Sequence, residues 1–318
     1  MAALLVPKTG QHAALGRSME RAALMAQAET DKKSLLVFDT GGTAAGAAAA
    51  ARAARKAGVA VILGPVFAAE TVAVLTAVAG AIPVISFSND AALLERGAFL
   101  LGITARQVVT GVLTYAARRG VMRVAVSGPG DDWGKQARTA ALAIAPGLGL
   151  TVTQLPDDAR DIVLPVGASG SADGLPDALL MTSAGSLAAI APAAAAQGIQ
   201  LLAATPALDF APEILGRIEG AWVAAPEPAR VAGFARQFED RNGSAPGTIT
   251  VLAYDAVRIV GQARVSGGVD RSALLVQGGF KGISGDIRFR DDGSAARTMA
   301  ILAVVGGALR TVAPAPTA

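Results

Sequence analysis

Short runs of apolar residues alternate with longer, helix-like segments through the first hundred residues. The strand-like runs are residues 2–6, 34–38, 59–64 and 82–87, and the helix-like segments are residues 13–29, 43–56 and 69–78. Such alternation is typical of a parallel sheet that is covered by helices on both faces. Gly41 and Gly42 follow the second run, and Thr43 is a suitable N-cap for the next helix.

A second series of the same kind begins near Arg106. Its strands are expected at residues 123–128, 150–155, 178–183, 199–205 and 220–226, and its helices at 106–119, 132–145 and 186–197. After Pro228 the pattern returns to two helices, at 229–241 and 250–264, and the segment 285–304 then reads as an antiparallel hairpin around Asp291-Asp292-Gly293.

This order predicts an α/β protein with two doubly wound parallel-sheet lobes, a hinge and a cleft between the lobes. We expect residues 1–104 and 228–277 to form lobe 1, and residues 105–227 and 278–318 to form lobe 2. Ligands of open α/β sheets bind beyond the carboxyl ends of the strands, so the site is expected there.

Composition removes several classes of function. The 318 residues are 52% hydrophobic, carry a net charge of +3 and include no cysteine. The basic residues are scattered rather than gathered in a stripe, which argues against a nucleic-acid partner. Without cysteine, disulfides and thiol nucleophiles are excluded, and with His12 as the single histidine a histidine-based zinc site is not expected.

Two uncharged stretches, residues 71–89 and 178–208, resemble membrane spans in composition only. Glycine and proline interrupt both, whereas a spanning helix needs about 20 unbroken apolar residues. We therefore predict buried strands and Ala-rich helices, and no transmembrane segment. The segment 3–7 is interpreted as a first strand rather than as a secretory leader.

The triplet Asp39-Thr40-Gly41 is the one that carries the catalytic carboxylate in aspartic proteases. Those enzymes need two such carboxylates close together, and the sequence contains no second copy. Here the triplet ends a strand and an Ala-rich helix follows at once. Asp39 is therefore predicted to be a polar residue at the carboxyl end of a parallel strand, near the expected ligand site.

The other polar motifs do not form a catalytic set. Neither "GGTAAG" nor "GASGSADG" has the spacing or the lysine of a phosphate loop, and "PDDARD" (156–161) reads as a solvated loop. His12 lies beside the start of the first helix, where a surface or capping role is expected. No nucleophile, base and orienting group come together, so we predict a protein that is not an enzyme and has no cofactor or metal.

Four segments resemble the type I periplasmic binding proteins, the superfamily of Leu/Ile/Val-binding extracellular receptors. They are "VFDTGGTAAGAAAAARAARKAGVAVILGPVFAAET" (37–71), "IPVISFSND" (82–90), "VAVSGPGDDWGKQART" (124–139) and "LAYDAVRI" (252–259). The resemblance covers almost the whole chain, and it implies a non-enzymatic, two-lobe binding protein of the periplasm.

Within that superfamily, "DTGGT", "LGPVFAAE", "PVISFSND" and "FLLGIT" are most similar to the penicillin-binding protein activators of proteobacteria. That branch implies a lipoprotein that stimulates a peptidoglycan synthase, anchored by an N-terminal segment outside this sequence. The alternative is an ABC-transporter receptor for a branched-chain amino acid or another small polar solute, whose partner is the transporter permease.

The resemblance also implies which residues face a ligand. On lobe 1 these are Phe67, Ala68 and Ala69 after the third strand and Ser88, Asn89 and Asp90 after the fourth; on lobe 2 they are Trp133, Thr182, Ser183, Thr205 and Asp209. Receptors for amino acids hold the carboxylate with hydroxyls and N–H groups of the first two turns, and the ammonium with an acidic residue of lobe 2.

Several of these positions depart from the amino-acid pattern. Alanine stands at positions 68 and 69 in place of a hydroxyl, Asp90 would tend to repel a carboxylate, and Pro206-Ala207 lacks the acidic partner for an ammonium. Each lost charge-assisted hydrogen bond typically costs about 1.5–3 kcal/mol. Trp133 provides a flat wall for a ligand or, alternatively, a core aromatic residue that fixes the start of its helix.

Overall fold

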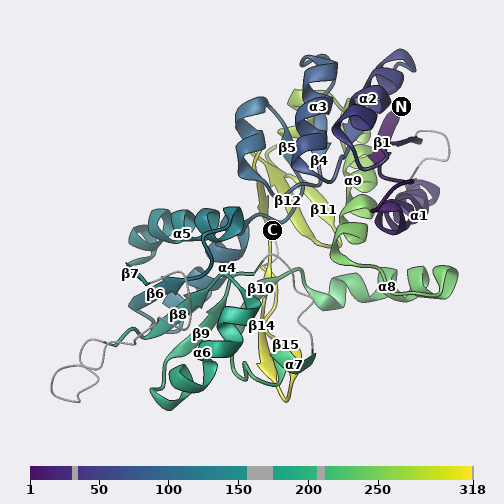
Figure 1. The fold of residues 1–318 in the computed structure, drawn as a ribbon. Coiled ribbons are helices and arrows are strands. Elements are labelled where there is room, and N and C mark those ends of the chain that lie inside the picture. The colour runs from purple at the N-terminus through teal and green to yellow at the C-terminus, as the bar shows by residue number, and fades with distance from the viewer. Residues whose placement is uncertain (31–34, 156–174, 206–211, 317–318) are drawn as a thin grey trace. The chain divides into compact units, whose positions relative to one another are not determined.

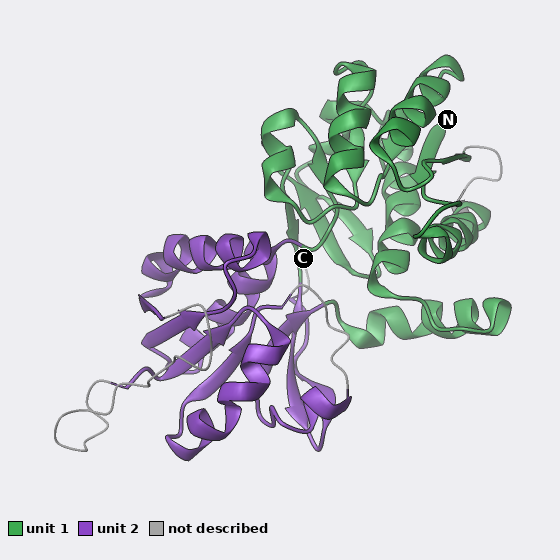
Figure 2. Cartoon of the chain, viewed as in Figure 1, with its two compact units in different colours: residues 1–103, 226–298, 318 green, residues 104–225, 299–317 purple. Residues whose placement is uncertain are grey.

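The computed structural model describes residues 1–30, 35–155, 175–205 and 212–316. The chain forms two compact units, which Figure 2 colours separately. The first unit contains residues 1–103 and 226–298, and the second contains residues 104–225 and 299–317.

The first unit is built on a five-stranded parallel sheet with the order β2-β1-β3-β4-β5 (Figure 1). Its strands are β1 (Ala2–Val6), β2 (Leu35–Asp39), β3 (Val61–Leu63), β4 (Val84–Ser86) and β5 (Phe99–Leu100). Its connections contain α1 (Ala13–Thr30), α2 (Ala44–Lys56), α3 (Ala68–Val78) and the 3-10 helix η1 (Ala91–Arg96). Thr43 caps α2 by accepting a hydrogen bond from the Gly46 N–H, as its sequence position predicted.

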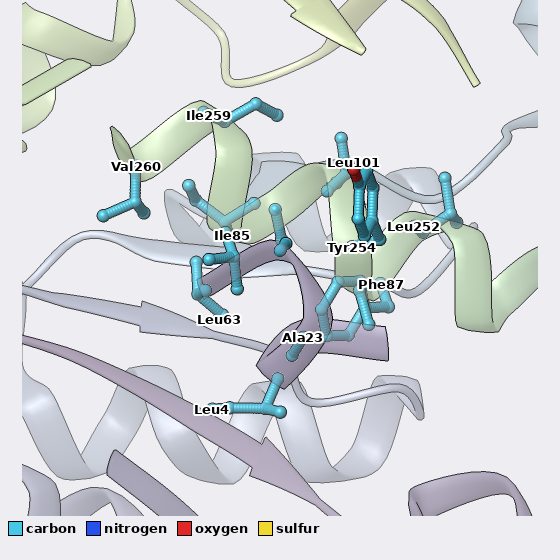
Figure 3. Packing of buried hydrophobic residues seen from close by; sticks show 14 of the residues in the cluster. Leu4, Ala23, Leu63, Ile85, Phe87, Leu101, Leu252, Tyr254, Ile259 and Val260 are labelled. Carbon is cyan, nitrogen blue, oxygen red and sulfur yellow. The ribbon is translucent and has the colours of Figure 1, made fainter. Parts of the chain in front are cut away.

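The alternation of side chains along β1 explains why both faces of this sheet are covered. Ala3 and Leu5 point to the side of α2 and α3, where small alanines of α2 allow close packing. Leu4 and Val6 point to the opposite side and pack with α1 and with α9 (Thr248–Val265). Figure 3 shows this second cluster, in which Leu4, Ala23 and Tyr254 are labelled.

The second unit has a seven-stranded sheet with the order β15-β14-β10-β9-β8-β6-β7. The parallel strands are β6 (Arg123–Ser127), β7 (Thr151–Gln154), β8 (Ala178–Met181), β9 (Gln200–Ala203) and β10 (Trp222–Ala225). The antiparallel strands are β14 (Ala300–Val305) and β15 (Ala308–Ala313). The helical elements are α4 (Ala105–Arg118), α5 (Asp132–Ile144), η2 (Ala145–Leu148), α6 (Ala184–Ala196) and α7 (Pro212–Leu215). Two lobes with parallel sheets, predicted from the sequence, are confirmed.

The last third of the chain differs from the expected division. Residues 278–298 were expected in lobe 2, but they belong to the first unit, together with α8 (Pro228–Asn242) and α10 (Arg271–Leu274). They form a three-stranded antiparallel sheet of β11 (Phe280–Gly282), β12 (Gly285–Phe289) and β13 (Ala295–Arg297). The predicted hairpin around residues 291–293 is present between β12 and β13. Residues 278–298 belong to the first unit because the side chains of Phe280, Ile287 and Phe289 are buried in its hydrophobic core.

A buried polar network attaches this small sheet to α9. The Asp255 carboxylate accepts hydrogen bonds from the Ile283 N–H at 2.8 Å and from the Ser284 N–H at 2.9 Å, and it also accepts from the Ser284 hydroxyl. Arg297 donates to the Ser284 hydroxyl and to the Leu101 carbonyl, the latter at 2.6 Å. Burial lowers the pKa of Arg297 to about 10, and the nearby Asp255 acts in the opposite direction.

Candidate functional site

The loops that follow β1, β2, β3 and β4 lie at one edge of the first sheet. Because these strands are parallel and adjacent, their carboxyl ends share that edge. Phe67–Ala69 follow β3 and Ser88–Asp90 follow β4, so the predicted site residues of lobe 1 come from neighbouring loops. The candidate site of the first unit is built from these loops.

Asp39 holds the loops after β1 and β2 together. Its carboxylate accepts hydrogen bonds from the Lys8 N–H at 2.7 Å, the Thr9 N–H at 3.2 Å, the Thr9 hydroxyl at 2.6 Å and the Gly41 N–H at 2.8 Å. Partial burial raises the pKa of Asp39, but these hydrogen bonds outweigh it and hold that pKa below its ordinary value. The negatively charged Asp39 side chain therefore joins the loops after β1 and β2 by hydrogen bonds.

His12 and Phe67 form a ring pair at this edge. Their ring centroids are 4.5 Å apart with an interplanar angle of 46°, and both side chains are half-buried. Gly42 has φ of +69°, and a β-carbon there would lie 3.7 Å from His12 Cδ2, an ordinary van der Waals contact. The sequence suggested a surface or capping role for His12 and missed this contact; the available signal was its place in the loop after a parallel strand.

Glu70 is a buried acid in the first turn of α3. The residue is 1% exposed, and its Oε1 accepts a hydrogen bond from the Thr40 hydroxyl at 2.7 Å. Its Oε2 has no hydrogen-bond partner among the described residues. Burial raises the pKa of Glu70, and the Thr40 hydroxyl and the nearby Phe67 backbone only partly offset that rise. Nothing in the sequence pattern pointed to this burial, since an acid in a first helical turn is common for capping reasons.

The residues after β4 are largely occupied within their own loop. The Ser88 hydroxyl is buried and accepts from the Asp90 N–H at 3.2 Å. Asp90 is the N-cap of η1 and accepts from the Ala92 N–H at 3.0 Å. Asn89 is exposed. The carboxylate of Asp90 thus stabilises the start of η1, which reduces the repulsion that we expected between Asp90 and an anionic ligand.

In the second unit, Trp133 lies at the start of α5. Trp133 is 8% exposed, and its Nε1–H donates to the Ala204 carbonyl at 2.8 Å. This hydrogen bond joins the start of α5 to the end of β9. Of the two roles considered for Trp133, these contacts favour the packing role.

Three further predicted residues follow β8 and β9. Thr182 is 2% exposed, and its Oγ1 has no hydrogen-bond partner among the described residues. A β-carbon at Gly128 would lie 1.8 Å from that hydroxyl, so the glycine leaves the space that Thr182 fills. Ser183 caps α6, and Thr205 is buried. Asp209, Pro206 and Ala207 lie outside the described residues.

The described part of the chain contains no group of three or more acidic or histidine side chains that could hold a metal ion. No helix in the same part has the length and apolar character required to cross a membrane.

The fold and the family are shown by comparison with known proteins. The chain is similar to a protein from Rhodospirillum rubrum, provisionally described as a branched-chain amino acid ABC transporter, with 20% identity, a TM-score of 0.79 and coverage of 98% of this chain and 99% of that chain. It is also similar to the leucine-binding protein LivK from Thermotoga maritima, with 23% identity, a TM-score of 0.62 and coverage of 98% and 97%.

A third similar structure is a solute-binding protein of an ABC transporter from Rhodopseudomonas palustris, in complex with 3,4-dihydroxybenzoic acid. It has 17% identity, a TM-score of 0.66 and coverage of 99% of this chain and 96% of that chain. No curated protein matches the chain. The sequence model of the family described as periplasmic binding protein matches residues 2–308. The chain therefore belongs to the periplasmic binding protein family.

Proposed function

We propose that this protein is the solute-binding receptor of an ABC transporter, located in the periplasm, and that it binds a small solute without converting it. The observation that carries the proposal is the open edge of the first sheet. There the N-terminus of α3 has no side-chain cap from Phe67, and a half-buried ring pair stands beside it. Uncapped N–H groups and an aromatic surface are the features of a small-molecule site.

The similar structures are better accounted for by a transport receptor than by an activator of peptidoglycan synthesis. The sequence alone placed the penicillin-binding protein activators first and a solute receptor second. The family match and the similar structures support the second hypothesis and do not show the activator branch. The proposed partner is accordingly a transporter permease rather than a peptidoglycan synthase.

The predicted ligand residues remain part of this proposal. On the first unit they are Phe67–Ala69 and Ser88–Asp90. On the second unit the end of β8 offers the buried hydroxyl of Thr182, whose Oγ1 is without a partner among the described residues. An unpaired buried hydroxyl is costly, and a ligand atom that bonds to it would remove that cost. Ser183 and Thr205 complete the proposed set, whereas Trp133 is assigned the packing role that its hydrogen bond to Ala204 favours.

A thermal-shift screen of the purified protein tests this function. The panel contains the amino acids, small aliphatic and aromatic carboxylates, and muropeptide fragments. A ligand at 100 times its dissociation constant stabilises the folded state by about 2.7 kcal/mol. For a chain of this size that corresponds to a rise in Tm of about 4 °C. A saturable rise with one solute class supports a receptor; no response to any solute, combined with capture of a peptidoglycan synthase, would refute it.

A further inference from the structure

In the described part of the chain, three segments carry the backbone from one unit to the other. These crossings lie at residues 103–104, 225–226 and 298–299. They join β5 to α4, β10 to α8 and β13 to β14, and each is only a few residues long. Segments of this length leave few backbone dihedral angles to absorb a movement between the units, so the contacts that hold their ends decide how freely they move.

Asp286 of β12 holds the first-unit ends of two of these crossings. Its backbone N–H donates to the Thr298 hydroxyl at 2.8 Å, and its carbonyl accepts from the Thr298 N–H at 3.0 Å. Its Oδ1 accepts from the Arg230 guanidinium at 2.5 Å, and that guanidinium also donates to the Gly282 carbonyl at 2.8 Å. Thr298 is the last residue of the first unit before the third crossing, and Arg230 lies in the first turn of α8, shortly after the second crossing. One residue of the small sheet is therefore bonded to both segments.

Arg297 brings the remaining crossing to the same place. Its guanidinium donates to the Leu101 carbonyl at 2.6 Å and to the Ser284 carbonyl at 3.3 Å. Leu101 follows β5 and leads into the first crossing, whereas Arg297 immediately precedes Thr298 and the third crossing. Leu101 and Arg297 are 196 residues apart in the sequence, so their hydrogen bond depends on the fold of the whole unit. Ser284 is bonded in turn to Asp255 of the buried helix α9.

Gly285 permits the close packing at this junction. Its φ is +124°, a conformation that favours glycine, and a β-carbon there would lie 2.4 Å from the Thr298 carbonyl oxygen. A side chain at this position would therefore require the backbone of Thr298 to move. The close approach of β12 to the third crossing is thus specified by the sequence.

The Asp286 carboxylate is shielded from water, with its side chain 11% exposed. Burial by itself raises the pKa of Asp286, but the hydrogen bonds from Lys281 and Arg230 outweigh that effect and hold this pKa below its ordinary value. The carboxylate is therefore charged at neutral pH, and its bonds to both partners are charge-assisted. The partners differ in position, because Arg230 belongs to α8 after the second crossing, whereas Lys281 is 61% exposed on β11 and also contacts Gln262 of α9.

From these contacts we propose a positioning role for Asp286 and Arg297. The end of the small sheet formed by β12 and β13 is a common anchor for the three crossings, and these two residues keep the first-unit ends of the crossings together. Movement between the units is then confined to the residues beyond the anchor, and the three segments move as one. This inference goes beyond the proposed receptor function, and its test needs no solute.

Distances between two spin labels, measured by pulsed electron paramagnetic resonance on the full chain, test the anchor. The chain contains no cysteine, so Ala49→Cys on α2 and Ala195→Cys on α6 provide one labelling site on each unit, and both alanines are exposed. In this doubly labelled protein, Asp286→Ala and Arg297→Gln are each expected to at least double the width of the distance distribution. Widths equal to that of the unsubstituted protein in both variants would overturn the proposal.

Substitutions of the two partners of Asp286 identify which of its bonds matters. Arg230→Ala breaks the bond to α8 from the other side, so it should widen the distribution as much as Asp286→Ala, and the double variant should widen it no further. Arg230→Ala also keeps the test available if circular dichroism shows that Asp286→Ala does not fold. Lys281→Ala is the matched control, because it removes a bond to the same carboxylate from a residue outside the crossings, and it should leave the width unchanged. If Lys281→Ala widened the distribution as much as Arg230→Ala, the role assigned to the crossing contact would be wrong.

Asp177→Ala controls for a general loss of stability. Asp177 accepts from the Arg123 guanidinium at 2.8 Å and from the Met122 N–H at 2.9 Å, and all three residues belong to the second unit. This variant also loses an aspartate–arginine pair, but it should not widen the distribution. Equal widening in Asp177→Ala and Asp286→Ala would show that the width reports stability alone, and it would overturn the positioning role.

Discussion

Substitution of Asp255 by alanine removes the centre of the network that attaches the β11–β13 sheet to α9. Asp255 is fully buried, and it accepts hydrogen bonds from two backbone N–H groups and one hydroxyl of Ile283 and Ser284. In the Asp255→Ala variant these donors would be left in a buried environment without an acceptor. Arg297 would also lose the carboxylate that offsets part of the cost of its burial.

The expected loss is large because the partners that remain are buried. Breaking a buried charged pair by removing one partner typically costs about 3–5 kcal/mol. We expect a decrease of that size in the free energy of unfolding of the first unit. For a unit of roughly 150–250 residues, each 1 kcal/mol lowers Tm by roughly 2–4 °C. The Tm of the first unit should therefore fall by at least about 6 °C.

Urea denaturation followed by circular dichroism measures this loss, and hydrogen exchange of the segment 280–298 locates it. Asp270→Ala is the matched control, since Asp270 also accepts from one backbone N–H and one serine hydroxyl but is exposed to water. Water replaces the lost acceptor there, so a much smaller change is expected. If Asp255→Ala lowered the free energy of unfolding by no more than an ordinary surface substitution, about 0.5 kcal/mol, the network would not stabilise the fold as argued.

Three further predictions concern single buried groups. The pKa of Glu70 is raised in the folded state, so its contribution to stability is present below pH 4.5 and is lost as the pH rises through the folded-state pKa. The free energy of unfolding of Glu70→Gln, relative to that of the native protein, should therefore increase as the pH rises above 4.5. Urea denaturation at several pH values measures this difference. Gly128→Ala places a β-carbon against the Thr182 hydroxyl and should destabilise the second unit by about 3 kcal/mol; adding Thr182→Ala should restore part of this loss in the same assay. Trp133→Phe removes the hydrogen bond to Ala204 and should cost about 1 kcal/mol while leaving solute affinity unchanged, which a titration would contradict if the indole contacts the ligand.

The arrangement of the parallel sheets could be predicted because it depends on short-range patterns. In β1, the alternation of Ala3 and Leu5 with Leu4 and Val6 requires two covering layers, and the helices on either side of each strand provide them. The unit to which residues 278–298 belong could not be predicted in the same way. Their hairpin is local, but its place depends on contacts such as that of Phe289 with Phe99, whose ring centroids are 5.2 Å apart. No periodicity in the sequence reports a contact over so long a separation.

The residues of the candidate site were selected in another way. The resemblance to the type I periplasmic binding proteins implied Phe67 and Ser88, and the rule that ligands bind at the carboxyl ends of parallel strands is consistent with that choice. It does not select His12, because a lone histidine before a helix has several common roles. Nor does it select Glu70, because burial of an acid in a first helical turn depends on tertiary packing around Thr40. Both residues became candidates only when a ring contact and an unpartnered oxygen were seen.

The hydrogen bonds of the polar side chains at this edge of the first sheet determine which groups are left to select a solute. Asp39 accepts hydrogen bonds from backbone N–H groups of the loops after β1 and β2, and Ser88 and Asp90 accept from the backbone of their own loop. These side chains therefore build the site more than they contact its ligand. The remaining groups are backbone N–H groups, one buried acid and two ring faces. Backbone donors serve any carboxylate in nearly the same way, whereas stacking requires a flat partner at a short distance. Discrimination among carboxylates should therefore follow the shape of the attached group more than its charge.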